Sequence, residues 1–181
     1  MIMTKKTLFH ELTGIDPQVM GLKPDPVTPE SISYTILLSG YMMEYYRVGP
    51  ERKKVVALFW GPQEHVVPSH RGLSKFHSLK DGTDKKVTHE EMLHCLRRYG
   101  GVREVYWQMR ELYRNKVADR IYMAQHMTPA ERYAHVEATQ PWVFELAEKE
   151  DIASYLRVDV GELEGLRRHC YSTAGRKTAT E

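Results

Sequence analysis

Carboxylate and imidazole side chains gather between residues 64 and 77, where they could bind a metal ion. Four residues supply these ligand types, which Zn²⁺ accepts in proteins: Glu64, His65, His70 and His77. Their spacing matches no usual zinc motif, and the alternative is that they are exposed histidines of a loop and a strand. We favour exposed histidines and expect neither a metal site nor another cofactor.

The remaining reactive residue types give no sign of an enzyme. Cys95 and Cys170 are far apart and form no CxxC pair, which argues against a disulfide framework, a zinc ribbon or an iron–sulfur cluster. The sequence also has no phosphate-binding glycine loop, no nucleophile–base motif and no paired carboxylates of a known type. We therefore expect a protein without catalytic activity.

Composition places the chain among soluble globular proteins. It has 181 residues, of which 41% are hydrophobic and 28% charged, and this length suits one medium domain or two small ones. The longest strongly apolar run, residues 55–60, is far too short to span a bilayer. No apolar stretch of a signal peptide follows the lysines near the N-terminus. We expect a cytoplasmic protein that has no membrane partner.

Charge is divided unevenly along the chain. Residues 1–127 hold 19 lysines and arginines against 14 acidic residues, a net charge of +5, whereas residues 128–181 hold 7 against 10, a net charge of −3. This division bears on nucleic-acid binding, because a surface that contacts phosphates must be positively charged.

Short strands are predicted in the first half of the chain. Stretches rich in β-branched and aromatic residues, ended by glycine or proline, cover residues 31–38, 41–48, 55–60, 75–80 and 85–87. The third stretch is apolar throughout, so we expect burial on both faces. The last two could pair across a turn at Asp81-Gly82. Strands of this length and spacing indicate a small antiparallel barrel or jelly-roll sheet.

Helical periodicity begins at Thr88, which forms a capping box with Glu91. Gly100-Gly101 should end this first helix, and a second, longer helix is predicted over residues 102–125. Its apolar residues follow a 3-4-3 spacing, typical of a coiled-coil seam: Val102, Val105, Met109 and Leu112. Such a stripe needs a partner, which is either the protein's own sheet or a second copy of the helix.

The last third of the chain predicts a helix-turn-helix. Thr128 and Glu131 form another capping box, with proline at the first helical position. Further on, residues 151–156 form a short apolar-faced helix, and Asp159 can cap a helix over residues 160–169. Two short helices joined by a tight turn at residues 157–158 make the motif.

These residues resemble a known family. The C-terminal matches are Glu131-Arg132-Tyr133, Pro141, Ile152-Ala153-Ser154-Tyr155-Leu156, Leu163 and Leu166-Arg167; the upstream ones are Leu37-Leu38-Ser39-Gly40-Tyr41, Tyr45-Tyr46 and Phe59-Trp60-Gly61-Pro62. Together they are similar to the Crp/Fnr family of transcriptional regulators. The resemblance implies an α+β fold with three parts. These are an antiparallel β-roll sensor of the double-stranded β-helix (jelly-roll) type over residues 1–101, a dimerisation helix over 102–127 and a helix-turn-helix domain over 128–181.

The resemblance also implies a function and its residues. The expected protein is a homodimer that binds DNA under the control of a small-molecule effector. The implied DNA contacts are Ser154, Tyr155, Arg157, Arg167 and Arg168. The implied effector-binding residues are Glu64, His70 and Arg71, and the implied dimer contacts are Val105, Met109 and Leu112.

Departures from the family pattern leave a second interpretation open. The positions that would read bases hold Val160, Gly161, Glu162, Glu164 and Gly165, where the family usually has Arg, Glu, Thr or Ser. A glycine cannot form the two bonds that an arginine forms with a guanine edge. Arg71-Gly72-Leu73 also lacks the Arg-Ser/Thr-Ala run of cyclic-nucleotide sites, so we do not expect cyclic AMP as the effector. The alternative is a ligand-sensing or protein-interaction module that has lost sequence-specific DNA binding.

Overall fold

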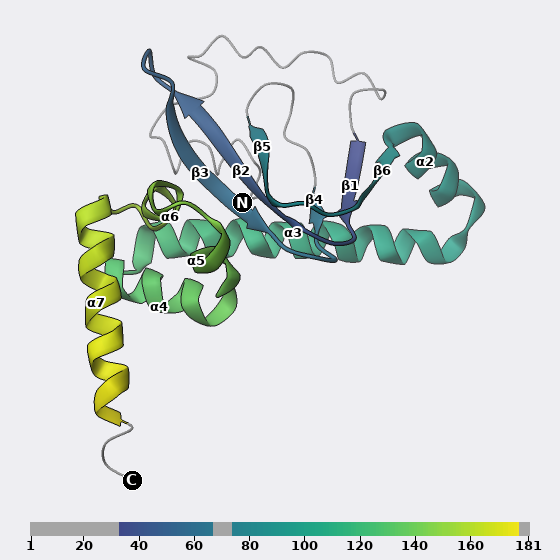
Figure 1. Cartoon of the computed structure of the whole chain (residues 1–181). Helices are drawn as coiled ribbons and strands as arrows, with labels where there is room; N and C mark the ends of the chain where they lie inside the picture. The colour runs from purple at the N-terminus through teal and green to yellow at the C-terminus, as the bar shows by residue number, and fades with distance from the viewer. Residues whose placement is uncertain (1–32, 67–73, 178–181) are drawn as a thin grey trace. The chain divides into compact units, whose positions relative to one another are not determined.

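A computed structural model describes residues 33–66 and 74–177 (Figure 1). The chain divides into two compact units, Met1–Tyr122 and Met123–Glu181, called here the N-terminal and C-terminal units. The long helix α3 (Gly100–His126) contributes to both. No helix among the described residues has both the length and the apolar composition needed to cross a membrane.

The N-terminal unit is built on two antiparallel sheets. Its strands are β1 (Ser33–Leu37), β2 (Tyr41–Val48), β3 (Lys53–Trp60), β4 (His65–Val66), β5 (Lys75–Lys80) and β6 (Asp84–Thr88). Their orders are β4-β1-β6 in one sheet and β3-β2-β5 in the other (Figure 1). This arrangement, followed by the helices below, confirms the predicted α+β class with an antiparallel β-roll.

The predicted pairing of the last two strands is wrong. β5 pairs with β2, and β6 pairs with β1, so the two strands lie in different sheets. The turn at Asp81-Gly82 therefore crosses from one sheet to the other instead of closing a hairpin. The two-residue strand β4 was not predicted, because two residues carry no periodicity.

Strand β3 confirms the predicted burial on both faces, since residues 56–60 are almost completely buried. Its register with β2 shifts between Glu44 and Tyr45, so Ala57 has no opposite residue, as in a β-bulge. The carbonyl of Ala57 accepts a hydrogen bond from Nε of Arg120 at 3.1 Å. The buried guanidinium of Arg120 thus binds a backbone carbonyl at the irregularity of the strand.

Helix α2 (His89–Arg98) begins at the predicted capping box. The Thr88 hydroxyl accepts from the Glu91 amide at 3.2 Å, and the Glu91 carboxylate accepts from the Thr88 amide at 2.8 Å. Tyr99 is the extended residue that ends the helix, and Gly100-Gly101 open α3 instead of following α2 as a stop. The predicted long helix is otherwise confirmed to within two residues at each end.

The C-terminal unit consists of the end of α3 and four further helices: α4 (Pro129–Thr139), α5 (Trp142–Leu146), α6 (Lys149–Leu156) and α7 (Val160–Lys177). Apolar residues from all four close the core. The ring centroids of Tyr133 and Phe144 lie 4.8 Å apart across α4 and α5. The predicted helix-turn-helix corresponds to α6 and α7.

The second capping box predicts an acid-dependent contribution to stability. Hydrogen bonds from the Thr128 amide and hydroxyl hold the pKa of the Glu131 carboxyl below its ordinary value of 4.5. The unfolded chain therefore binds more protons at this group, so the contribution is present above about pH 4.5 and is lost as the pH falls through the folded pKa. Glu131→Gln should be less stable than the parent at pH 6. The difference should shrink towards pH 3 in urea unfolding, and a constant difference would contradict the assignment.

Candidate effector cavity and candidate DNA-binding surface

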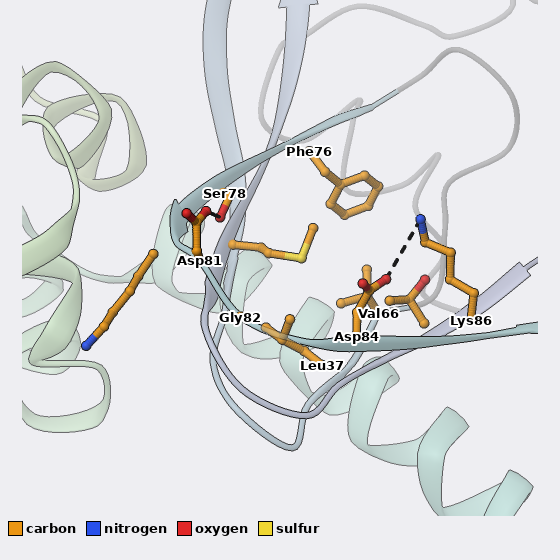
Figure 2. Close-up of a pocket in the computed structure, with 11 residues that line it drawn as sticks. Leu37, Val66, Phe76, Ser78, Asp81, Gly82, Asp84 and Lys86 are labelled. Carbon is orange, nitrogen blue, oxygen red and sulfur yellow. Dashed lines mark hydrogen bonds and ion pairs between the residues drawn. The ribbon is translucent and has the colours of Figure 1, made fainter.

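A cavity of about 420 Å³ lies in the N-terminal unit between the two sheets of the roll (Figure 2). Its apolar lining comes from both sheets: Leu37, Met42, Val66 and Phe76. Its polar lining comes from β1, β5, β6 and the crossover turn: Thr35, Ser78, Lys80, Asp81, Asp84 and Lys86. The volume is in the range of ordinary small-molecule sites.

Charges among the described residues of the cavity are balanced. The Asp84 carboxylate lies 3.8 Å from Nζ of Lys86, and the Ser78 hydroxyl donates to Asp81 at 3.4 Å. Figure 2 shows these two polar pairs on opposite sides of the apolar side chains. With two lysines against two aspartates, the lining suits a small amphipathic molecule better than a strongly anionic one.

The cavity wall is closed by a close approach of two turns. A Cβ on Gly82 would lie 2.0 Å from the carbonyl oxygen of Ser39. The Leu38 amide donates to the Thr83 carbonyl at 2.9 Å, and the Thr83 amide donates to the Ser39 hydroxyl at 3.0 Å. Only glycine fits between these backbones. Gly82, which suggested a hairpin turn in the sequence, is therefore required here by packing.

A partly buried ion pair joins α3 to the turn after β3. Nζ of Lys116 lies 2.5 Å from the Glu64 carboxylate and 4.7 Å from the centroid of the Trp60 ring. Burial lowers the pKa of Lys116, although the neighbouring Glu64 carboxylate acts in the opposite direction. The second Glu64 oxygen accepts from the Gly61 amide at 2.6 Å. Glu64 therefore connects the turn after β3 to the long helix.

Glu44 is a fully buried acid in the same layer. Its carboxylate accepts from Nε1 of Trp60 at 3.3 Å and from the Ser74 hydroxyl at 2.6 Å. Burial, and then the Glu44 charge, raise the pKa values of Tyr46 and Tyr113. The layer is thus a connected polar network beneath the helix rather than an apolar seam.

Of the three predicted effector-binding residues, Glu64 alone belongs to the described part of the chain. Glu64 is paired with Lys116 and is not part of the cavity lining, while His70 and Arg71 lie outside the described residues. Among the histidines weighed for a metal, His65 is half-buried in β4 and His77 is exposed in β5. The described residues contain no group of three His, Cys, Asp or Glu side chains placed to hold a metal ion.

The helix-turn-helix is held by backbone geometry and one buried arginine. Arg157 ends α6 in the left-handed conformation, with φ 55° and ψ 49°. The Asp159 carboxylate accepts from the Glu162 amide at 2.7 Å and caps α7. Arg132 donates from Nε to the Leu156 carbonyl and from Nη1 to the Met127 carbonyl, each at 2.6 Å.

Arg157 occupies a position that favours glycine. A left-handed conformation costs an ordinary residue about 1–2 kcal/mol, and the guanidinium makes only a long hydrogen bond, 3.5 Å, to the Ala124 carbonyl. Arg157→Gly should therefore raise the free energy of unfolding by about 1 kcal/mol, as measured by urea denaturation. Arg157→Ala keeps the strain and is the matched control, so equal stability of the two variants would contradict this account.

The predicted DNA contacts fall into three groups by exposure. Arg157 and Arg168 are exposed, whereas Ser154 and Arg167 are half-buried, the latter with its guanidinium 5.9 Å from the centroid of the Phe144 ring. Tyr155 is only 3% exposed. It lies one helical turn from Ile152 on the inner face of α6, so its side chain does not reach the surface where a DNA contact was expected.

The exposed side of α7 carries little that could read bases. Gly161, Glu162 and Glu164 face solvent, and a Cβ added to Gly165 would have no neighbour within 4 Å. Lys149 lies 3.9 Å from Glu164 in an exposed ion pair. The structure thus keeps the scaffold of the motif, with an acidic and glycine-containing outer face.

The three predicted dimer contacts also separate. Val105 and Leu112 are 52% and 62% exposed, whereas Met109 is buried within its own unit. The apolar stripe of α3 therefore divides into a part that packs on its own unit and a part that faces solvent.

Several candidate residues were missed by sequence reasoning. In β5, Phe76 and Ser78 lie two residues apart and both line the cavity, and this alternation was the available signal. No local signal marks Glu44 and Arg120, because charged residues are normally exposed.

Comparisons with known proteins identify the fold. No protein-family model matches the sequence, and no curated protein matches it at a significant level.

FixK2 from Bradyrhizobium japonicum is structurally similar, with a TM-score of 0.64 and 16% identity, over 79% of this chain and 76% of that one. A protein from Eubacterium rectale assigned to the Crp/Fnr family of transcriptional regulators gives 0.55 at 11% identity, over 80% and 71% of the two chains. A cyclic nucleotide-binding domain containing protein from Listeria monocytogenes gives 0.60 at 13% identity, over 92% and 90%. The β-roll, the long helix and the helix-turn-helix occur here in the predicted order, so the chain has the fold of the Crp/Fnr regulators that its sequence resembles.

Proposed function

We propose that this protein is a transcription regulator that binds duplex DNA as a homodimer, under the control of a small molecule held in the roll cavity. The observation that carries the proposal is the helix-turn-helix itself, whose second helix, α7, has an exposed outer side. A second helix presented in this way can enter the major groove. One structurally similar protein is assigned to a family of transcriptional regulators, which supports the same role.

The proposed contacts are to phosphates more than to bases. Arg157 and Arg168 are exposed cations at the turn and on α7, and Arg167 and Ser154 lie close to them in the sequence. Gly161 and Gly165 offer no hydrogen-bonding side chains to the groove. We therefore expect binding that depends strongly on salt and discriminates weakly between sequences.

The proposed effector is a small amphipathic molecule other than cyclic AMP. Within the described part of the chain, the cavity lining has an apolar part and equal numbers of lysines and aspartates, so these residues offer no concentrated positive charge to a cyclic phosphate. The exposed residues Val105 and Leu112 on α3 are the proposed dimer contacts.

A second candidate function rests on the acidic outer face of α7. Glu162 and Glu164 are exposed in a unit whose net charge is −3, and both would repel phosphates. In this case the helix-turn-helix is kept for packing, and the protein is a ligand-sensing or protein-interaction module.

Salt-dependent duplex binding separates the two candidates. Arg157 and Arg168 of each copy would make four phosphate contacts in a dimer. These should give a slope of about −3.6 in a plot of log affinity against log salt, because each contact contributes about −0.9. Fluorescence anisotropy with a random-sequence duplex measures this slope. Selection from a random duplex pool should return only a weak consensus, and no measurable binding at low salt would favour the module.

Gly165→Arg should raise the affinity of α7 for guanine-containing duplex DNA. A guanidinium at this position could bond a guanine edge, and a good bidentate contact contributes about 1–3 kcal/mol, so we expect at least about tenfold higher affinity for a guanine-containing selected site. Gly165→Ala is the matched control, because it gives the same gain in helix propensity without a donor. If both variants bind DNA equally, α7 does not meet the groove.

A further inference from the structure

A line of aromatic and guanidinium side chains runs along one side of the first half of α3. Its members are separated by four, three and four residues, a spacing that keeps them on one side of a helix: Arg103, Trp107, Arg110 and Arg114. All four are exposed, and the Trp107 side chain is 55% exposed. The line, called here the arginine–tryptophan stripe, extends about 16 Å along the helix.

The centre of the stripe is already ordered. The guanidinium of Arg110 lies 5.3 Å from the centroid of the Trp107 ring and 5.7 Å from that of Tyr106. The two rings meet edge to face at 5.8 Å. Because stacked aromatic and arginine side chains have little freedom left to lose, a partner could bind them at a small entropic cost.

Two guanidinium groups of the stripe lack a carboxylate partner within the described residues, those of Arg103 and Arg110. Arg114 differs, since it forms an exposed ion pair with Glu111 at 3.1 Å. The stripe therefore presents positive charge on both sides of an exposed indole.

The stripe is separate from the proposed dimer contacts. At 100° per residue, Trp107 is rotated about 200° from Val105, so the two lie on opposite sides of α3. One heptad beyond Arg114, on the side of the stripe, Ile121 is buried in its own unit. This side of the helix is thus covered by the chain at one end and bare at the other.

We propose that the arginine–tryptophan stripe docks an acidic amphipathic helix of a partner protein. An apolar side chain of the partner would lie against Trp107, and its carboxylates would pair with Arg103 and Arg110. The straight 4-3-4 spacing matches the side of a second helix. This surface is independent of the proposed DNA and effector sites.

Composition favours a protein partner over a nucleic acid. All five lysine-or-arginine positions between residues 89 and 114 are arginines, and protein interfaces are enriched in arginine and tryptophan but depleted in lysine. Tryptophan and arginine are also the residues whose truncation most often weakens such interfaces. A surface that tracked a phosphate backbone would need no such bias against lysine.

The proposal is tested with a labelled, alanine-rich helical peptide of about 18 residues, long enough to be helical in water. The peptide carries one leucine flanked by glutamates at the complementary spacing, and a scrambled isomer has the same composition. Fluorescence anisotropy with the full chain should show binding of the first peptide that is at least about tenfold tighter than that of the isomer. Binding should also protect tryptophan fluorescence from iodide, because Trp107 is the exposed one of the three tryptophans, whereas Trp60 is buried and Trp142 is half-buried.

Variants test whether the peptide binds at the arginine–tryptophan stripe. Trp107→Ala and Arg103→Gln should each weaken peptide binding, the first by about tenfold or more. Arg110→Lys keeps the charge but loses the planar group, so it should also bind less tightly. Lys53→Gln, an exposed charge removal in β3, should leave the affinity unchanged. Equal melting temperatures of all four variants exclude unfolding as the cause.

Four results would overturn the proposal. Equal affinity for the scrambled isomer, or equally strong competition by single-stranded oligothymidylate, would make the stripe a general polyanion site. Unchanged peptide binding by Trp107→Ala would separate binding from the stripe. A change of molecular mass for Trp107→Ala in light scattering would assign the stripe to the contact between two copies.

Discussion

Arg132→Leu is expected to lower the free energy of unfolding of the C-terminal unit by about 3 kcal/mol. The guanidinium is 8% exposed and donates at 2.6 Å to the carbonyls of Leu156 and Met127. These carbonyls lie at the end of α6 and just after α3, where helical backbone groups lack partners within their own helix. Hydrogen bonds to a charged group contribute about 1.5–3 kcal/mol each, and the substitution removes both.

Burial, and then the charge of Arg157, lower the pKa of Arg132, while Glu162 raises it. The group nevertheless stays protonated, because arginine does not lose its proton in proteins near neutral pH. Arg132→Lys should keep the charge but carries all its donors on one nitrogen, whereas Arg132 uses two nitrogens for the two carbonyls, so its stability should fall between those of the parent and Arg132→Leu.

Urea unfolding followed by circular dichroism measures these differences. Arg168→Leu is the matched control, since Arg168 is exposed and its loss should change the free energy of unfolding by less than about 0.5 kcal/mol. If Arg132→Leu is as stable as Arg168→Leu, the buried guanidinium does not hold the two helix ends.

Gly82→Ala is expected to destabilise the N-terminal unit by about 3 kcal/mol. The added Cβ would lie 2.0 Å from the carbonyl oxygen and 2.3 Å from the carbonyl carbon of Ser39. Both atoms belong to the backbone, so the clash can be relieved only by separating two turns that share hydrogen bonds through Thr83. Overpacking of this kind costs about 1–3 kcal/mol of folding free energy. We expect Gly82→Ala near the upper end of this range, because the clashing atoms belong to the backbone and cannot rotate away.

Gly101→Ala is the control for Gly82→Ala. A Cβ on Gly101, in the first turn of α3, has nothing within 4 Å, so the variant should be as stable as the parent or more stable by up to about 1 kcal/mol. Thermal unfolding of the two variants compares one chemical change at a crowded and an open position. Equal melting temperatures would show that the turns move apart freely.

Elements with local signals were predicted well from the sequence. The capping boxes at Thr88 and Thr128 fixed two helix starts, because each is a contact between residues three apart. The pairing of β5 and β6 was not predictable in this way. Asp81-Gly82 is a typical hairpin turn, and only the distant partners β1 and β2 decide that the chain crosses to the other sheet.

The candidate site was predicted less completely than the fold. The α6–α7 scaffold followed from residues that are buried in the structure, such as Ile152 and Leu163, because packing restricts residue type strongly. The described cavity lining did not follow from the sequence: Glu64 belongs to an ion pair with Lys116, and the lining residues come from five strands. Such a lining is a product of tertiary pairing, which a linear pattern does not contain.

The bulge in β3 has a consequence for aggregation. β3 is an edge strand of its sheet, and a free edge is a template on which a strand of another molecule can add. Here the edge is buried, and Arg120 of α3 holds the carbonyl of Ala57. An incoming strand would have to displace the helix before it could pair with β3, so α3 protects this edge of the sheet against intermolecular strand addition.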